Sequence, residues 1–179
     1  SGGAGQGSGE PLSCDAVSDQ AKRIPNPYVG HDGYHCFGCD PNNPAGLQLS
    51  FTVEGNTLHS SWDPRPEFEG YPGVIHGGIQ ATLADEIGGW LIHVQMGTAG
   101  MTRDLQITYH KPARATDAPF QLVAHLVEET RRDAVVEVAI HGAGGTLFST
   151  ARCTYAVFSP EVARRKLSFP GAGAFQPQE

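Results

Sequence analysis

A single long segment with helical periodicity is the feature that most constrains the fold of this chain. The segments on either side of it have the periodicity of β-strands. From about Gly77 to about Met96, apolar residues recur every three or four positions, as on one side of an α-helix. At 100° per residue, that side carries Ile79, Leu83, Ile87, Trp90, Leu91 and Val94. The helix is therefore expected to pack this stripe against the rest of the protein.

The segments on either side of the helix alternate between apolar and polar residues. Residues 47–54 and 57–63 flank Gly55-Asn56, a hairpin signal, and residues 64–75 form a loop rich in proline and glycine. Four more extended runs follow the helix, at 101–112, 120–130, 134–142 and 146–159. The order predicts an α+β fold, with a long central helix wrapped by a curved antiparallel sheet of about six strands.

The length and composition of the chain fit one ordinary domain. The chain has 179 residues, of which 39% are apolar, enough for a sizeable core. Residues 1–30 begin with a Gly/Ser-rich stretch and are expected to be a flexible N-terminal segment. Residues 31–158 are then the folded domain, and residues 159–179 are a C-terminal tail.

Charge and hydropathy exclude several classes of partner. A formal net charge of −7 disfavours nucleic acid and anionic membranes, which require a basic surface. No run approaches the roughly 20 apolar residues of a membrane span, and the first 30 residues lack an export signal, so a cytoplasmic location is expected. The four cysteines are expected to be thiols there, not a disulfide scaffold.

Asp85 stands on an unusually bare side of the helix. Within about 60° of it on the wheel lie small residues, namely Gly78, Ala81, Thr82, Gly88 and Gly89. Glycines weaken a helix interior by about 0.5–1 kcal/mol each, so their presence indicates close approach of a substrate or another chain. The alternative is a solvated acid on an outer face, and Glu86, about 100° away, fits that alternative better.

The motif His76-Gly77-Gly78 begins the helix. Free N–H groups of a first helical turn attract anions, and glycines let a developing oxyanion come close. Nine residues separate His76 from Asp85, or about 13 Å along the axis and half a turn around it, so the two cannot converge on one atom. A two-fold dimer could place the helix start of one chain against the acid of the other.

Three blocks of the sequence resemble a known family. "GVIHGGIQATLADE" resembles the central-helix motif of hotdog-fold acyl-CoA thioesterases, specifically the phenylacetate-pathway (PaaI-like) group. "HCFGCDPNNPAGLQLSF", at residues 35–51, is similar to the N-terminal signature of a subset of that group, and "MTRDLQITYHKPA" is similar to the strand after the helix. The resemblance implies a hotdog fold, assembly as homodimers or dimers of dimers, and hydrolysis of an acyl-CoA thioester without a cofactor or metal.

The resemblance also implies residue roles. Asp85 would be the general base or nucleophile, the Gly77 N–H of the opposing chain would polarise the thioester carbonyl, and His76 would position that end of the helix. Thr102 would hold the attacking water. Gly78 and Glu86 are expected to contact the substrate. Many relatives carry asparagine six residues before the histidine, where this chain has Gly70.

The sequence also admits other interpretations. His31, His35, Cys36 and Cys39 could hold zinc, but no second pair of ligands follows, so no metal site is expected. The sequence lacks the G-x-S-x-G motif of serine hydrolases. A hotdog module that binds acyl-CoA without turnover is the alternative function.

The sequence does not specify the acyl chain, nor whether the mechanism uses a water molecule or a covalent anhydride. It also does not specify the residues that bind the CoA phosphates. The basic candidates for those phosphates are Lys111, Arg114, Arg131, Arg132, Arg164, Arg165 and Lys166.

Overall fold

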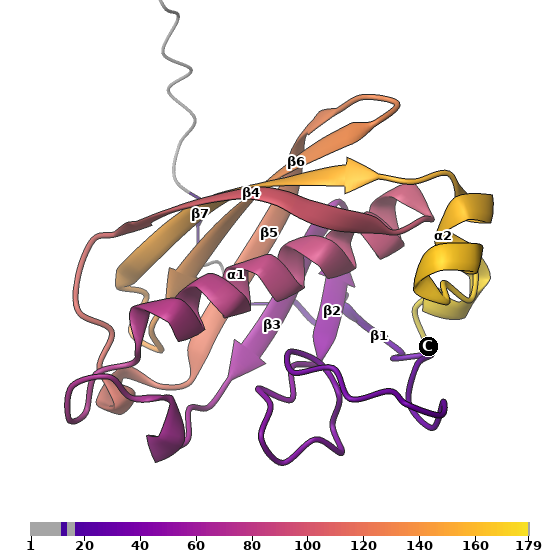
Figure 1. The fold of residues 1–179 in the computed structure, drawn as a ribbon. Coiled ribbons are helices and arrows are strands. Elements are labelled where there is room, and N and C mark those ends of the chain that lie inside the picture. The colour runs from indigo at the N-terminus through magenta and orange to yellow at the C-terminus, as the bar shows by residue number, and fades with distance from the viewer. Residues whose placement is uncertain (1–11, 14–16, 179) are drawn as a thin grey trace, which may run out of the picture.

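A long helix lies across a curved antiparallel sheet in the computed structural model, which describes residues 12–13 and 17–178 (Figure 1). Within that part of the chain the sheet has seven strands in the order β1-β2-β3-β5-β6-β7-β4, and every neighbouring pair is antiparallel. The strands are β1 (Lys22–Ile24), β2 (Phe51–Glu54), β3 (Thr57–Trp62), β4 (Gly100–Tyr109), β5 (Phe120–Glu129), β6 (Asp133–His141) and β7 (Leu147–Val157). The predicted α+β arrangement is confirmed, with seven strands in place of about six.

The additional strand, β1, comes from the region predicted to be a flexible N-terminal segment. Lys22–Ile24 pairs with β2, and Ile24 is buried in the core. The expectation of flexibility over residues 1–30 is therefore wrong for this stretch, while the Gly/Ser-rich residues 1–11 lie outside the described residues. Three residues with one buried side chain give too short an alternating pattern to be recognised as a strand.

Strand β2 begins later than the alternation predicts. Leu47 and Leu49 are buried as expected, but Gln48 between them has a φ of 56°, which interrupts the extended backbone. Their N–H groups bind the carbonyl oxygens of Phe37 and Gly38 in the preceding loop, at 2.7 and 2.9 Å. The segment therefore pairs with a loop before the sheet begins at Phe51.

The central helix α1 (Gly77–Leu91) begins at the predicted residue and continues into a π-helical turn, η2 (Ile92–Met96). Leu83, Ile87, Trp90 and Leu91 of the predicted stripe are buried against the sheet, while Ile79 and Val94 are only half-buried. The π turn ends at Gly97, whose φ of 63° suits glycine. Among the described residues, no helix is long and apolar enough to span a membrane.

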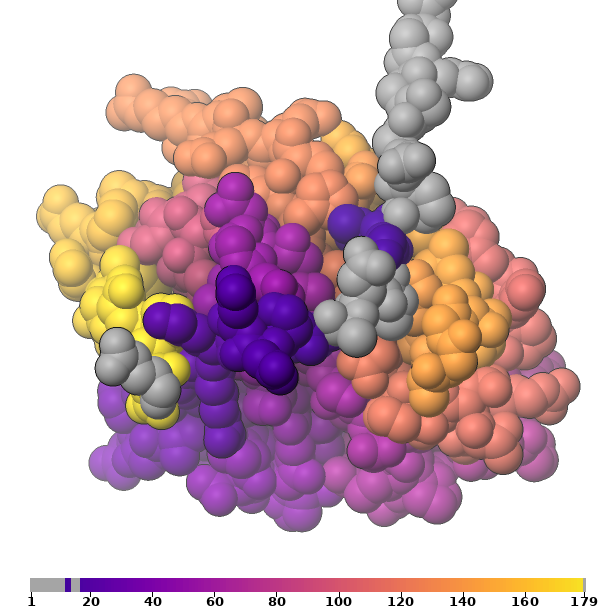
Figure 2. Space-filling model, turned by 180° about the vertical axis from the view of Figure 1, so that it is seen from behind, coloured from indigo at the N-terminus to yellow at the C-terminus, as the bar shows by residue number. Residues whose placement is uncertain are grey.

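The C-terminal residues predicted to be a tail pack onto the domain. They form α2 (Pro160–Leu167) and the 3₁₀ helix η4 (Ala172–Phe175), and they place Phe169 and Phe175 in the core. Seen from behind, this segment lies beside the first described residues of the chain (Figure 2). The Gln178 N–H donates to the Arg23 carbonyl oxygen at 3.1 Å. Two further 3₁₀ helices lie in loops, η1 (Pro66–Phe68) and η3 (Ala115–Asp117).

Strand β4 forms one edge of the sheet and runs alongside α1. Its register with β7 places Thr102 directly opposite Tyr155, so both side chains point to the helix-covered face. A bulge after Thr102 interrupts this register before Asp104. Such bulges bend a strand and re-aim its side chains. Met101 and Tyr109, near its two ends, expose large apolar side chains, at 53% and 47% of their surface.

Candidate functional site

Asp85 lines a cavity of about 470 Å³ between α1, β4 and the N-terminal loops, here called the Asp85 cavity. Thr102 on β4 donates its hydroxyl proton to the Asp85 carboxylate, with 2.7 Å between Oγ1 and Oδ1. Glu86, Met101 and Tyr155 also line this space. The sequence-predicted acid and hydroxyl are thus brought together, although 17 residues separate them in the chain.

Tyr155 on β7 is a further partner of Asp85 that the sequence analysis did not identify. Its hydroxyl lies 2.8 Å from the Asp85 carbonyl oxygen and 3.3 Å from Oδ1. Burial, together with the nearby Cys153 and Asp85, raises the pKa of Tyr155 above its ordinary value, so the phenol stays protonated and donates. Tyr155 is therefore a fixed hydrogen-bond donor to this part of the helix.

Gly88 and Gly89, the two glycines beside Asp85, differ in what a side chain at each position would contact. A Cβ atom at Gly88 would lie 2.2 Å from the Tyr155 hydroxyl, so this glycine admits a side chain of its own chain. The expectation that a substrate or second chain approaches Gly88 is therefore wrong. At Gly89 nothing lies within 4 Å of such a Cβ, and this residue lines the Asp85 cavity. Only Gly89 leaves space beside the acid for another molecule.

At the start of the helix, His76 is the N-cap of α1. Its Nδ1 accepts the Gly78 N–H at 2.9 Å, while its carbonyl accepts the N–H groups of Ile79 and Gln80. Gly78, predicted to contact substrate, therefore has its amide engaged within the chain. Among the hydrogen bonds of the described residues, none uses the Gly77 N–H, which remains an available donor at the positive end of the helix.

A second cavity, of about 710 Å³, opens at this end of α1 and is here called the helix-start cavity. It is lined by His76, Gly77 and Tyr109, among others. The Tyr109 hydroxyl donates to the Gly77 carbonyl at 2.6 Å and so joins the end of β4 to the helix start. As the spacing predicts, His76 and Asp85 face different cavities.

Three other residues of the helix-start cavity bear on the predictions. Gly70, at the position where many relatives carry asparagine, lies close to His76, since a Cβ there would be 3.3 Å from the imidazole Cδ2. Lys111, one of the candidate partners for CoA phosphates, also lines this cavity. Gln80 is buried there with its Oε1 unpaired among the described residues. The helix periodicity did not indicate a buried glutamine.

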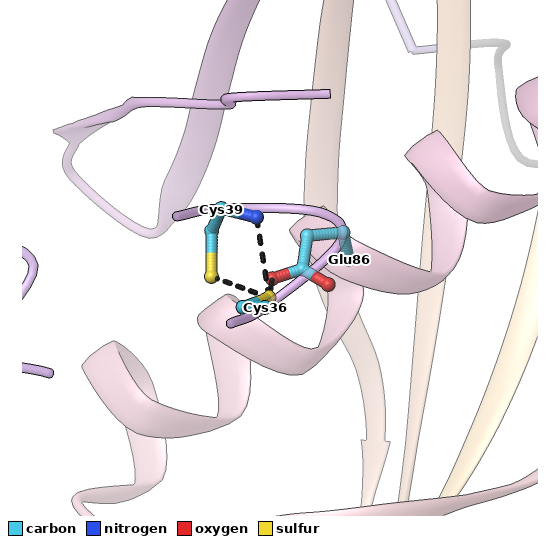
Figure 3. Close-up of side chains that lie close together, drawn as sticks. All are labelled: Cys36, Cys39 and Glu86. Atoms are coloured by element: carbon cyan, nitrogen blue, oxygen red, sulfur yellow. Dashed lines mark hydrogen bonds between the residues drawn. The ribbon is translucent and has the colours of Figure 1, made fainter. Parts of the chain in front are cut away.

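The Glu86 side chain lies against the loop that contains Cys36 and Cys39 (Figure 3). Its Oε1 lies 3.4 Å from Cys36 Sγ and accepts the Trp90 indole N–H at 3.2 Å. The Cys39 thiol donates a hydrogen bond to the Cys36 sulfur, with 2.9 Å between the two sulfur atoms. This hydrogen bond lowers the pKa of Cys36. The same hydrogen bond, together with burial, raises the pKa of Cys39. The prediction of a solvated Glu86 is wrong, because the carboxylate is held by this loop.

The residues that sequence analysis missed come from elements far apart in the chain. Tyr155 follows the inward alternation of β7, which is visible in the sequence, but its pairing with Thr102 depends on the register between β4 and β7. Tyr109 and the contact between Glu86 and Cys36 depend in the same way on how distant segments meet. Periodicity predicts which side of an element faces inward, but not what it faces.

Comparisons with known proteins agree with this architecture. Residues 72–149, which include α1 and β4, match the family model described as Thioesterase superfamily. No match was found among curated protein sequences.

Several solved structures are similar to this chain. The crystal structure of a thioesterase superfamily protein has a TM-score of 0.62 and 23% identity, with 68% of this chain and 60% of that chain covered, so this chain spans less than two thirds of that protein. A hypothetical thioesterase protein with coenzyme A from Streptococcus pneumoniae has a TM-score of 0.54 and 23% identity, with 59% of this chain and 84% of that chain covered. Zebra fish thioesterase superfamily member 2 has a TM-score of 0.57 and 21% identity, with 66% of this chain and 90% of that chain covered. The chain therefore has the expected hotdog fold.

Proposed function

We propose that this protein is a homodimeric or tetrameric thioesterase that hydrolyses an acyl-CoA to the free acid and CoA. Asp85 of one protomer acts as general base or nucleophile, and the Gly77 N–H of the partner subunit polarises the thioester carbonyl. The observation that carries the proposal is the carboxylate of Asp85, which lines a cavity and accepts the hydrogen bond of Thr102 at 2.7 Å. A carboxylate fixed in such a place can accept a proton or attack an acyl carbon.

The exposed edge of β4 supports a composite site. A ten-residue edge strand with unpaired backbone groups and exposed apolar side chains is suited to pair with another strand. Thr102, which binds Asp85, lies near one end of β4, while Tyr109, which binds Gly77, lies at the other. Two-fold antiparallel pairing of β4 with its copy would bring the Thr102 end of one strand alongside the Tyr109 end of the other. The Asp85 cavity of one protomer would then adjoin the helix-start cavity of its partner.

In such a site the chemistry needs no metal. Asp85 removes a proton from water while the water oxygen bonds to the thioester carbonyl carbon, and the carbonyl oxygen becomes negative. The Gly77 N–H of the partner subunit stabilises that charge, with help from the helix dipole. The carbon–sulfur bond then breaks, and the CoA thiolate takes up a proton. In the nucleophilic variant, Asp85 attacks the carbon directly, and water hydrolyses the resulting anhydride.

The substrate class is supported by the similar structures. The protein from Streptococcus pneumoniae was crystallised with coenzyme A, and a protein from Streptococcus mutans was crystallised bound to acetyl CoA. Lys111 in the helix-start cavity offers a positive charge for a CoA phosphate. We also propose that Thr102 orients Asp85 and the attacking water, and that His76 positions the Gly77 amide by capping the helix.

The alternative is a hotdog module that binds acyl-CoA without turnover, which the glycine at position 70 keeps open. The test is a panel of aryl-, short-chain and long-chain acyl-CoAs assayed by release of the free thiol, with wild type compared with Asp85→Asn. A thioesterase loses about 10²–10⁴-fold in turnover on losing its base, with folding and acyl-CoA affinity retained. If wild type binds these compounds but hydrolyses none above background, the binding module is the correct function.

A further inference from the structure

Three potential metal ligands meet at the second acid of the central helix. The ligand atoms of Cys36, Cys39 and Glu86 all lie within 4.8 Å of one another (Figure 3). The two cysteines belong to a tight C-x-x-C turn in the loop before β2, and the carboxylate comes from α1, 50 residues further along the chain. The C-x-x-C motif alone predicts no metal site, because no second pair of ligands follows it in the sequence. The third ligand comes from the helix and is brought to the motif only by the fold.

The turn is shaped to fit the carboxylate. A Cβ atom at Gly38, between the two cysteines, would lie 2.3 Å from the Glu86 carboxyl carbon, so no other residue fits there without displacement. The backbone on either side of Gly38 is fixed by the hydrogen bonds from Leu47 and Leu49. This close approach brings Glu86 against both sulfur atoms.

Neighbouring donors hold the three groups in place. The Cys39 N–H donates to Cys36 Sγ at 3.2 Å, and the Trp90 indole N–H donates to the Glu86 carboxylate. The Tyr34 hydroxyl contacts Cys39 Sγ at 3.0 Å, and Asn26 binds both that hydroxyl and the Cys39 carbonyl. Such surrounding hydrogen bonds orient metal ligands and fix them before a metal arrives.

We propose that Cys36, Cys39 and Glu86 bind one Zn²⁺ ion, with the fourth position open to water from the Asp85 cavity. Three atoms no more than 4.8 Å apart fit within a sphere of radius at most about 2.8 Å, close to zinc distances of about 2.3 Å to sulfur and 2.0–2.2 Å to oxygen. The two sulfurs, now 2.9 Å apart, must separate to about 3.8 Å for tetrahedral geometry, which small side-chain rotations achieve. Two thiol protons are released when zinc binds.

The ligand set selects the class of metal. Two thiolates and a carboxylate suit zinc, whereas Mg²⁺ and Ca²⁺ require oxygen ligands. The three ligands carry a total charge of −3, which a divalent cation largely neutralises. All three residues line the Asp85 cavity, so bound zinc would also stabilise its wall between the N-terminal loop and the helix. This inference does not depend on thioester hydrolysis, and its test has no activity readout.

The test measures metal binding to the whole 179-residue chain after reduction and removal of metals by a chelator. Every sample carries Cys14→Ser so that this thiol does not contribute, and the chain with this change alone is the reference, called wild type in this test. Titration with Co²⁺ should produce the visible absorption of tetrahedral thiolate coordination, and Zn²⁺ should displace it at one equivalent per chain. Cys36→Ser and Cys39→Ser should each weaken binding by at least about 100-fold, and Glu86→Gln by about 10-fold.

Cys153→Ser is the matched control, because this buried thiol contacts the Ala84 carbonyl on α1 and lies outside the cluster. It should bind zinc like wild type, and circular dichroism should report the same fold for all variants. The proposal is overturned if the reduced wild type takes up no zinc, or if Cys153→Ser abolishes binding while Cys36→Ser does not. It is also overturned if a disulfide forms between Cys36 and Cys39 and zinc uptake is absent after its reduction. The wild-type titration decides the matter even if a cysteine variant fails to fold.

Discussion

The two cavities along α1 contain different halves of the proposed catalytic site. The Asp85 cavity contains a carboxylate whose hydrogen-bond partners, Thr102 and Tyr155, come from the same chain. The helix-start cavity contains the Gly77 N–H, unpaired in the described part of the chain, beside the exposed side chains of Tyr71 and Tyr109. The Asp85 cavity is lined by the acid but not by Gly77, whereas the helix-start cavity is lined by Gly77 and, among the described residues, by no acid. Each is incomplete alone, which is why we infer that two protomers share the site.

The largest effect is expected from removing the Gly77 N–H, the hydrogen-bond donor of the helix-start cavity. Gly77→Pro deletes the N–H, and proline at the first position of a helix is otherwise well accepted. Gly77→Ala is the control. A Cβ atom at position 77 lies 3.2 Å from the Tyr109 side chain in either variant, but alanine keeps the N–H. We expect Gly77→Pro to lower kcat by about 10²–10³-fold relative to Gly77→Ala. Equal rates for the two variants in the thiol-release assay would remove the Gly77 amide from the mechanism.

The Asp85 half can be broken more mildly at Thr102. Thr102→Val removes the hydroxyl that donates to Asp85 but keeps the shape and β-branching suited to a strand. A hydrogen bond to a charged group contributes about 1.5–3 kcal/mol, so kcat should fall by about 10–100-fold. Thr102→Ser keeps the donor and should stay within about threefold of wild type. If the serine variant is as slow as the valine variant, the hydroxyl is not the reason for the effect.

The adjacent glycines of the Asp85 half should respond in opposite directions. Gly88→Ala forces a methyl group to within 2.2 Å of the Tyr155 hydroxyl and should destabilise the fold by about 1–3 kcal/mol. Gly89→Ala meets nothing within 4 Å and should stabilise the helix by about 0.5–1 kcal/mol. Denaturant unfolding of both variants measures the two free energies. Equal destabilisation by both would contradict the packing that distinguishes these glycines.

The far end of the helix should give the smallest effect, seen as a pH dependence. His93 donates from Nδ1 to the Thr98 carbonyl at 2.8 Å and stacks on Phe175 with 4.7 Å between ring centroids. Burial lowers the pKa of His93 in the folded protein, so the unfolded chain binds more protons in the range below its ordinary pKa of about 6.5. Stability should therefore fall as the pH drops through that value. His93→Asn should show a shallower decline, and an unchanged slope would exclude His93 as its source.

Much of this arrangement could be predicted from periodicity. Helix α1 begins at Gly77 as predicted, and the hairpin turn at Gly55 and the division of β5 from β6 fall where the turn residues indicate. Asp85 and Thr102 were assigned by resemblance to a family, and the structure brings them together. Strand β1, the partners of Glu86 and the pairing of Thr102 with Tyr155 could not be predicted, because each depends on contacts between distant segments.

The most direct test of the shared site is a mixed dimer of two inactive chains. Asp85→Asn and Gly77→Pro chains, carrying different affinity tags, are co-expressed, and the mixed dimer is isolated by sequential purification on both tags. Each mixed dimer would hold one site with an intact Asp85 from one chain and an intact Gly77 amide from the other. We predict that its acyl-CoA hydrolysis rate recovers to about half that of the wild-type dimer, because one of two sites is complete. A mixed dimer as inactive as its two parents would contradict the account.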